Sequence, residues 1–164
     1  MICNDYTSPN YNDRVNDCAP SMIVIHYTGM KTAQAALQRL CNPEAEVSAH
    51  YVIDEDGTLY QLVDEDKRAW HAGVSCFGDE QACNDFSIGI ELEGADDTPY
   101  EAAQYQQLAE VTRCLMAAYP GITRERITGH SDIAPGRKTD PGSAFDWQRF
   151  RSLVSHPDST RGKL

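Results

Sequence analysis

The sequence predicts a single α/β domain in which a central mixed β-sheet lies between helices. Short apolar runs rich in β-branched residues alternate along the chain with longer segments that carry apolar residues at helical spacing. An Asp-Gly turn between two short strand-like segments predicts an antiparallel hairpin, so we expect the sheet to be mixed. A chain of 164 residues is long enough for one continuous core and has the usual size of one domain.

Two buried strands are expected at the centre of the sheet. Residues 22–25 form a continuous run of Met, Ile and Val, typical of a strand buried on both faces, and His26 ends this run. Residues 87–92 alternate, which places three aliphatic side chains on one face and Gly89 and Glu91 on the other.

The other elements follow from hydrophobic spacing and from turn residues. We expect a hairpin over residues 50–63 and a short strand at 126–128. Helices are expected over residues 31–41, from 98–99 up to the Pro-Gly pair at 120–121, and from the capping residue Asp146 through 154.

The domain boundaries follow from composition. Residues 1–20 are rich in Asn, Asp, Pro and Ser and are expected to form an irregular arm that lies on the domain. The domain itself is expected over residues 21–154, including a loop rich in Gly, Pro and charge at 129–144. Residues 155–164 are expected to form a loose tail.

The composition argues against several classes of partner. Lys and Arg total 14 and Asp and Glu total 25, and the resulting net charge of −11 repels phosphate backbones and anionic lipid headgroups. No apolar run approaches the ~20 residues of a membrane span. We therefore expect binding to neither nucleic acid nor membrane, and we separately expect a monomer. No signal peptide is visible at the start, which predicts a cytoplasmic location, or a periplasmic one if a leader was removed.

The six cysteines form no C-x-x-C pair, which argues against a zinc ribbon or a thioredoxin-like site. Cys41 and Cys114 fall on the apolar faces of expected helices and are expected to be buried. Cys76 and Cys83 flank a loop, and they would pair only in an oxidising compartment.

Three candidate metal ligands occur where the chain leaves expected strands. His26 lies at the C-terminal end of a buried strand, a usual place for functional groups in α/β sheets, and His130 follows the strand at 126–128. Asp140 lies further along the same loop. Two imidazoles and one carboxylate form a catalytic zinc set with the fourth position open to water. Taken alone, such residues are more often packed histidines and an ordinary loop.

The segments around these residues resemble a known family. Five of them, in order, resemble the zinc-dependent N-acetylmuramoyl-L-alanine amidases of the AmpD type, a family that includes amidases like phage T7 lysozyme and the peptidoglycan recognition proteins. The resemblance covers roughly residues 20–154. The segments are IHYTG at 25–29, VSAHY at 47–51, RAWHAG at 68–73, NDFSIGIE at 84–91 and GHSDIAPGRKTDPG at 129–142.

The resemblance implies that His26, His130 and Asp140 hold zinc and that Glu91 and Lys138 are catalytic. The implied reaction hydrolyses the amide between the lactyl group of N-acetylmuramic acid, including its 1,6-anhydro form, and L-alanine of the stem peptide. The implied partners are therefore muropeptides from peptidoglycan. Glu91 would act as general base and then acid, and the Lys138 ammonium would stabilise the oxyanion. Without the resemblance, both would be interpreted as ordinary solvated charges.

Three further side chains are candidates for substrate contact. His50, Trp70 and His71 lie inside the matching segments, and we expect them on the wall of the cleft. The alternative for each histidine is a hydrogen-bonded position inside the fold, and for Trp70 it is a place in the core.

The two halves of the chain resemble different branches of the family. From Trp70 onward the chain is similar to cytoplasmic recycling enzymes that act on 1,6-anhydro-muropeptides. The short stretch from His26 to Val47 is instead similar to a branch of broader specificity, because recycling enzymes carry a longer insertion there. We therefore expect a more open cleft that also admits ordinary muramyl peptides. The change from one resemblance to the other falls near residues 68–73. Such a change is expected for a natural intermediate between the branches and equally for a recombined or designed sequence.

The alternative function is a peptidoglycan-binding module that keeps the fold without turnover. Binding-only relatives typically lack a metal ligand, whereas the full set of ligands and both catalytic candidates are present here. A zinc peptidase of another lineage has no support, since no His-Glu-x-x-His segment occurs in the chain.

Overall fold

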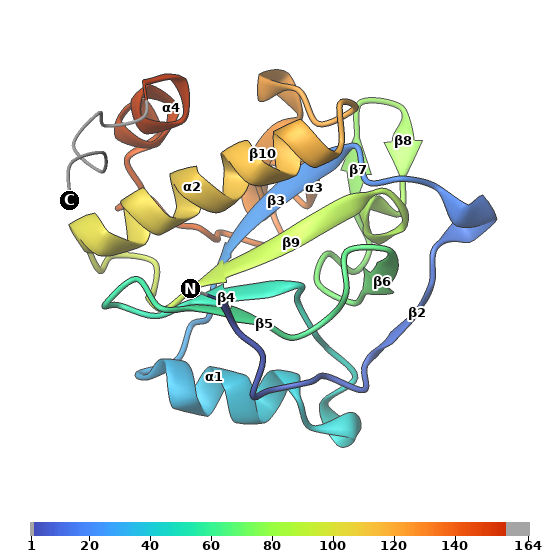
Figure 1. Ribbon diagram of the computed structural model, residues 1–164, viewed down its shortest axis with the longest axis horizontal. Coiled ribbons are helices and arrows are strands. Elements are labelled where there is room, and N and C mark those ends of the chain that lie inside the picture. The colour runs from blue at the N-terminus through green and yellow to red at the C-terminus, as the bar shows by residue number, and fades with distance from the viewer. Residues whose placement is uncertain (1, 157–164) are drawn as a thin grey trace, which may run out of the picture.

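A computed structural model describes residues 2–156 and is built on a six-stranded mixed β-sheet (Figure 1). The strand order is β1-β5-β4-β9-β3-β10, in which β4 and β5 form an antiparallel hairpin and the other neighbours are parallel. This is the mixed sheet that the sequence predicts. The strands are β1 (Ile2–Cys3), β3 (Met22–Tyr27), β4 (Tyr51–Ile53), β5 (Leu59–Gln61), β9 (Ser87–Leu92) and β10 (Ile127–Gly129).

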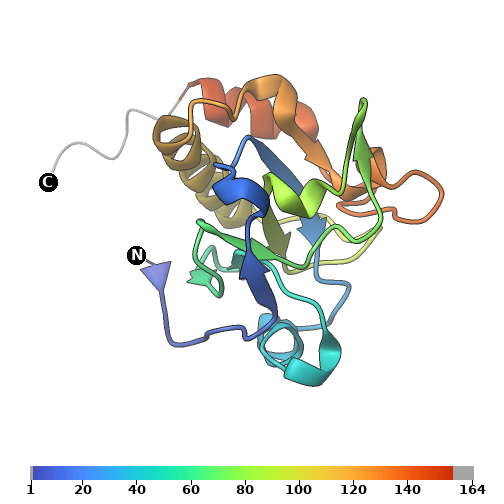
Figure 2. The ribbon, with the colours of Figure 1, turned by 90° about the vertical axis from the view of Figure 1, so that its right-hand side faces the viewer.

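Helices cover both faces of this sheet (Figure 2). Helices α2 (Ala102–Ala118) and α4 (Trp147–Ser155) pack together on one face, where their apolar side chains join Ile23 and Ile25 of β3 in the largest core cluster. Helix α1 (Ala33–Leu40) and the short helix α3 (His130–Ile133) lie on the other side. Because Met22 and Val24 belong to a cluster on that second side, β3 is buried on both faces as predicted.

Short elements complete the fold outside the main sheet. Two small antiparallel sheets pair β2 (Tyr11–Asp13) with β6 (Lys67–Ala69) and β7 (Cys76–Phe77) with β8 (Glu80–Gln81). Single 3₁₀ turns are η1 (Val15–Asp17), η2 (Pro43–Ala45), η3 (Cys83–Asp85) and η4 (Arg124–Arg126).

The three parallel strands β3, β9 and β10 bring the functional candidates to one edge of the sheet. In the β3–β9 register His26 lies opposite Glu91, and in the β3–β10 register Ile25 lies opposite Gly129. His130 follows directly after β10. The carboxyl ends of parallel strands are the usual position of ligand sites in α/β sheets, so the backbone alone gathers these side chains.

The three predicted helices are present, but α1 begins at Ala33 rather than at residue 31, and α3 lies within the segment 129–144 that the sequence predicts to be a loop. Helix α2 begins at Ala102 rather than at residues 98–99, because Glu101 is the N-cap and forms a capping box with Gln104. Asp146 caps α4 as predicted, since its Oδ1 accepts a hydrogen bond from the backbone N–H of Arg149 at 2.9 Å.

The N-terminal arm is more regular than expected. Its first strand, β1, adds to the edge of the main sheet beside β5, and β2 pairs with β6. The expectation of an irregular arm is therefore wrong for these two strands, whose two and three residues carry too little pattern to be found in the sequence. The domain boundaries themselves stay a prediction, and residues 157–164 of the expected tail lie outside the described part of the chain.

The cysteines differ from the prediction. Cys41 is half-buried and Cys114 is exposed, so the expectation that both are buried is wrong. Cys114 is next to Leu115 of the buried stripe of α2, and one residue along a helix turns the side chain by about 100°. Cys76, which is exposed, and Cys83, which is buried, are both free thiols in the structure.

Candidate active site

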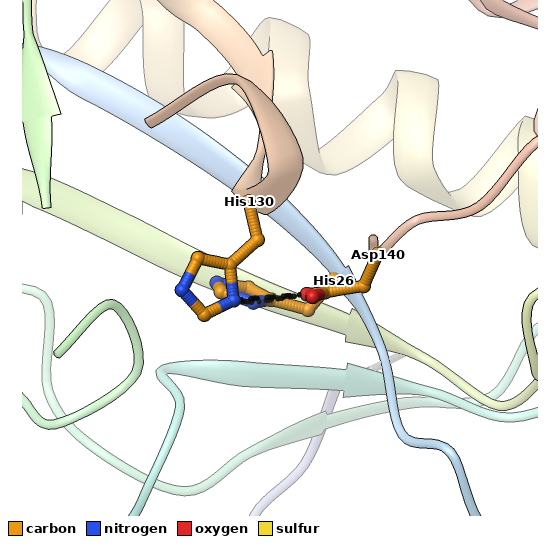
Figure 3. A group of neighbouring side chains, drawn as sticks. All are labelled: His26, His130 and Asp140. Atoms are coloured by element: carbon orange, nitrogen blue, oxygen red, sulfur yellow. Dashed lines mark hydrogen bonds and ion pairs between the residues drawn. The ribbon is translucent and has the colours of Figure 1, made fainter. Parts of the chain in front are cut away.

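Three buried side chains turn toward a common point at the C-terminal edge of the sheet (Figure 3). His26 comes from β3, His130 from the start of α3 and Asp140 from the loop after it. Nδ1 of His26 lies 2.8 Å from Oδ2 of Asp140 and 3.0 Å from Nδ1 of His130, and the third side of the triangle is 3.1 Å. The structure thus brings together all three predicted ligands.

The loop that carries Asp140 is fixed by its own backbone and by Asp132. The N–H of Ser131 donates to the carbonyl of Asp140 at 2.9 Å. The Asp132 carboxylate accepts hydrogen bonds from the Thr128 hydroxyl and from the N–H of Gly129, so it orients the start of the loop rather than a ligand imidazole.

The outer nitrogen of His130 shows which ring atom faces the triangle. His130 Nε2 lies 2.9 Å from the carbonyl oxygen of Ala72, which only accepts, so Nε2 carries the proton and Nδ1 keeps a free lone pair. Zinc bonds of about 2.0–2.2 Å in a tetrahedral arrangement place neighbouring ligand atoms roughly 3.3–3.6 Å apart, so the three atoms need to separate by only about half an ångström to hold the ion. The triangle and its two-imidazole, one-carboxylate chemistry therefore fit zinc.

The ionisation of the triangle also suits a cation. Burial lowers the pKa of His26 to about 4, even though the adjacent Asp140 carboxylate opposes this change. Burial alone would raise the pKa of Asp140, but its close contacts with the His130 and His26 rings hold it well below its ordinary value. At neutral pH the site therefore presents a neutral His26 imidazole and an ionised Asp140 carboxylate, the states in which these groups bind metals.

Glu91 lies beside the triangle with an unpartnered oxygen. Its Oε2 is buried and has no hydrogen-bond partner within the described residues. Burial, together with repulsion from the Asp140 charge, raises the pKa of Glu91 well above its ordinary value, and the charge of Lys138 opposes this rise. A carboxylate in such a position is available to take up and release a proton.

A cavity of about 380 Å³ lies over the triangle and contains both catalytic candidates, Glu91 and Lys138. One wall comes from α1 and the segments around it. This is the stretch from His26 to Val47, which is expected to be shorter than in the recycling enzymes. Sequence reasoning did not single out three polar residues that also line the cavity, namely Tyr27, Arg39 and Arg137. Tyr27 and Arg137 lie inside the matching segments, but no signal separates Arg39 from an ordinary surface arginine.

The three expected substrate contacts have different positions. Trp70 and His71 line the cavity, and the Trp70 indole N–H donates to Asn12 Oδ1 at 2.8 Å. His50 is fully buried and does not line the cavity; its ring is hydrogen-bonded to the N–H of Gly89 and the carbonyl of Lys67. His50 therefore has the alternative position, inside the fold.

A match to a protein-family model identifies the family to which this chain belongs. The model of the Amidase_2 family, N-acetylmuramoyl-L-alanine amidase, matches residues 16–143. The chain belongs to this family. No helix within residues 2–156 of this amidase is long and apolar enough to cross a bilayer.

Individual relatives of the amidase support the assignment. The 1,6-anhydro-N-acetylmuramyl-L-alanine amidase AmpD of Salmonella typhimurium strain SL1344 is 49% identical over 93% of this chain and 92% of its own length. A crystal structure of a selenomethionine AmpD derivative superposes with a TM-score of 0.83, at 47% identity over 90% of this chain and 92% of that one. The Escherichia coli amidase AmiD, in a complex with anhydro-N-acetylmuramic acid-L-Ala-D-γ-Glu-L-Lys, gives a TM-score of 0.74 at 34% identity over 85% of this chain and 60% of that one.

Proposed function

We propose that this chain is a zinc-dependent amidase that cleaves the bond between N-acetylmuramic acid, in its 1,6-anhydro form, and L-alanine. The observation that supports this proposal most directly is the buried triangle of His26, His130 and Asp140 beside Glu91. The Oε2 atom of Glu91 is buried and has no hydrogen-bond partner among the described residues. The name of the Salmonella relative and the ligand in the AmiD structure support this substrate class.

The residues divide the chemistry between them. Bound zinc supplies a Lewis acid and an acidified water molecule. Glu91 accepts a proton from the attacking water and delivers it to the L-alanine nitrogen as the C–N bond breaks. The raised pKa of Glu91 suits the first half of this exchange, because it makes the carboxylate a stronger base toward the proton of the attacking water. The products are a lactyl carboxylic acid and the free peptide.

Lys138 lies on the exposed side of the same cavity. Its ammonium group carries the charge opposite to that of the oxyanion that forms when water adds to the amide carbonyl. A cation held beside that position stabilises the transition state more than the neutral substrate, which is the requirement for catalysis.

The preference between glycan ends is a separate part of the proposal. The segment from His26 to Val47 is short and contributes α1 to one cavity wall. We propose that this cavity also admits ordinary N-acetylmuramyl peptides, although the relatives are named for the anhydro form.

A digest of 1,6-anhydro-MurNAc-tripeptide and of MurNAc-tripeptide, followed by mass spectrometry, tests the function. We expect free tripeptide from both substrates with zinc, and none after chelation. The matched control is Glu91→Gln, which keeps the size of the side chain but cannot accept a proton. We expect this variant to bind one zinc ion and to lose about 10²–10⁴-fold in kcat.

Each opposite result has a distinct meaning. Stoichiometric zinc without cleavage of either substrate would favour a peptidoglycan-binding module. A protein that binds no zinc would show that the ligand assignment is wrong. Cleavage of the anhydro substrate alone would restrict the specificity without affecting the reaction.

We further propose that the enzyme is a monomer that works in the cytoplasm. One chain supplies every predicted ligand and catalytic side chain of the cavity. All six cysteines are free thiols in the structure, which suits a reducing compartment.

A further inference from the structure

His26 is connected to a buried hydroxyl group through a second histidine. Its Nε2, on the side of the ring away from the triangle, lies 3.0 Å from Nδ1 of His71. The other nitrogen of His71, Nε2, lies 3.1 Å from the hydroxyl of Ser87, which in turn donates to the carbonyl oxygen of Cys83. His71 is 9% exposed and Ser87 is fully buried.

The Cys83 carbonyl at the end of this series of hydrogen bonds determines which group donates in each of them. A carbonyl oxygen only accepts, so the single hydroxyl proton of Ser87 is used on Cys83. The Ser87 oxygen must then accept from His71, which places the proton of the neutral His71 ring on Nε2. The bare Nδ1 of His71 therefore accepts from Nε2–H of His26, and Nδ1 of His26 keeps its lone pair for the triangle.

We propose that Ser87, acting through His71, is a positioning residue that holds His26 in its metal-binding tautomer. The proposal rests on the zinc site of the proposed function. Metal-binding histidines need the ring proton on the outer nitrogen, and a partner that holds it there raises the affinity for the metal. Without the hydroxyl, His71 has no acceptor that selects its own tautomer.

The residues around His71 fix the position of its ring. A Cβ atom at Gly89 would overlap this ring, so the glycine in β9 provides the space in which His71 reaches His26. The Asn84 side chain accepts hydrogen bonds from the N–H groups of His71 and Ala72, at 3.1 and 2.8 Å. Because the Ala72 carbonyl accepts from His130, the segment of residues 71–72 orients both ligand imidazoles.

Zinc affinity of the full chain, measured by competition with a chromophoric chelator, tests the proposal. We expect Ser87→Ala to weaken zinc binding by about tenfold and His71→Leu by about 10- to 100-fold. His71→Asn should recover most of the loss, because its amide oxygen can accept from His26 near the place of Nδ1. Ser8→Ala is the matched control: Ser8 is another fully buried serine that donates to a carbonyl, that of Leu40, but within the described residues its hydroxyl forms no hydrogen bond to a histidine.

The outcomes separate this proposal from the function on which it rests. Wild-type affinity in Ser87→Ala, or equal losses in His71→Leu and His71→Asn, would overturn the positioning role while the zinc site stands. Loss of zinc by Ser8→Ala to the same extent would show that general stability accounts for the effect, and would also overturn it. A wild-type chain that binds no zinc would overturn the proposed function itself.

A spectroscopic measurement checks the direction of the bonds. In the zinc-loaded wild type, ¹⁵N-edited NMR of the histidine rings should show His71 with its proton on Nε2 and a bare Nδ1. A proton on Nδ1 of His71 would overturn the proposal, because that nitrogen would then be unable to accept from His26.

Discussion

Among single residues, Glu91 combines its proposed catalytic role with a cost in stability. Its pKa is raised by burial, so the folded chain favours the protonated acid more than the unfolded chain does. The folded state then binds more protons than the unfolded state at any pH between the ordinary value near 4.5 and the raised value. Stability must fall as the pH rises through this interval, at about 1.4 kcal/mol for each unit of the pKa shift.

Glu91→Gln should therefore stabilise the metal-free protein at pH 7.5. It should not do so below pH ~4, where Glu91 is protonated in both the folded and the unfolded state. Glutamine fills the same space and cannot ionise. Urea denaturation of both metal-free proteins across this pH range measures the difference in the free energy of unfolding. A difference that is independent of pH would show that Glu91 does not ionise with a raised pKa.

At the scale of elements, Arg14 fastens the N-terminal arm to the rest of the fold. This side chain is 5% exposed and donates hydrogen bonds to the carbonyls of Glu65, Asp85 and Ser87, at 3.0–3.1 Å. Burial lowers its pKa. A single guanidinium thus joins the loop before β6, the turn η3 and the first residue of β9.

Arg14→Met should destabilise the protein by about 3 kcal/mol, because the carbonyls lose charged donors while the volume is nearly kept. For a chain of this size this is a decrease in Tm of roughly 10 °C. Calorimetry checks the value, and Arg39→Met, on the exposed side of α1, is the control that should change stability by less than about 0.5 kcal/mol. A decrease in Tm equal to that of the control would contradict the fastening role.

The elements that could be predicted from the sequence are those whose pattern is local. The apolar run of β3, the alternation of β9 and the Asp-Gly hairpin each determine their own conformation, and the structure has them where expected. Strands β1 and β2 have no such pattern, since they exist only because β5 and β6 offer unpaired edges. The role of Arg14 was invisible for the same reason: its partners lie 51 to 73 residues away.

The candidate site shows the same division. The predicted ligands and Glu91 follow from strand ends and from the family resemblance, and the parallel sheet brings them together. The place of His50 was open between two alternatives, because a histidine in a matching segment looks the same whether it lines the cavity or lies behind it. The structure places it behind, bonded to Gly89. Ser87 carried no signal of its own, since its contact with His71 depends on tertiary packing.

At the scale of the whole molecule, the cavity differs in charge from the rest of the chain. The net charge is −11, yet the cavity is lined by three cations, Arg39, Arg137 and Lys138, against the two carboxyl groups of Glu91 and Asp140. The ligand of the AmiD structure contains a γ-linked glutamate, whose α-carboxylate remains free. An acidic peptide is therefore repelled by the molecule at long range and attracted by the cavity at short range. At contact the nearby cations outweigh the distributed negative charge, because the Coulomb energy falls with distance.

Salt should therefore weaken substrate binding without affecting the chemical step. Between about 20 and 300 mM ionic strength, where the Debye length shortens from roughly 20 Å to below 10 Å, we expect KM to rise several-fold and kcat to change little. Arg39→Gln should weaken this dependence, and a substrate whose glutamyl carboxylate is amidated should show the same weakening with the wild-type enzyme. Steady-state kinetics on both substrates checks this. A KM that falls as salt is added would mean that repulsion by the net charge of −11 outweighs the attraction of the cavity.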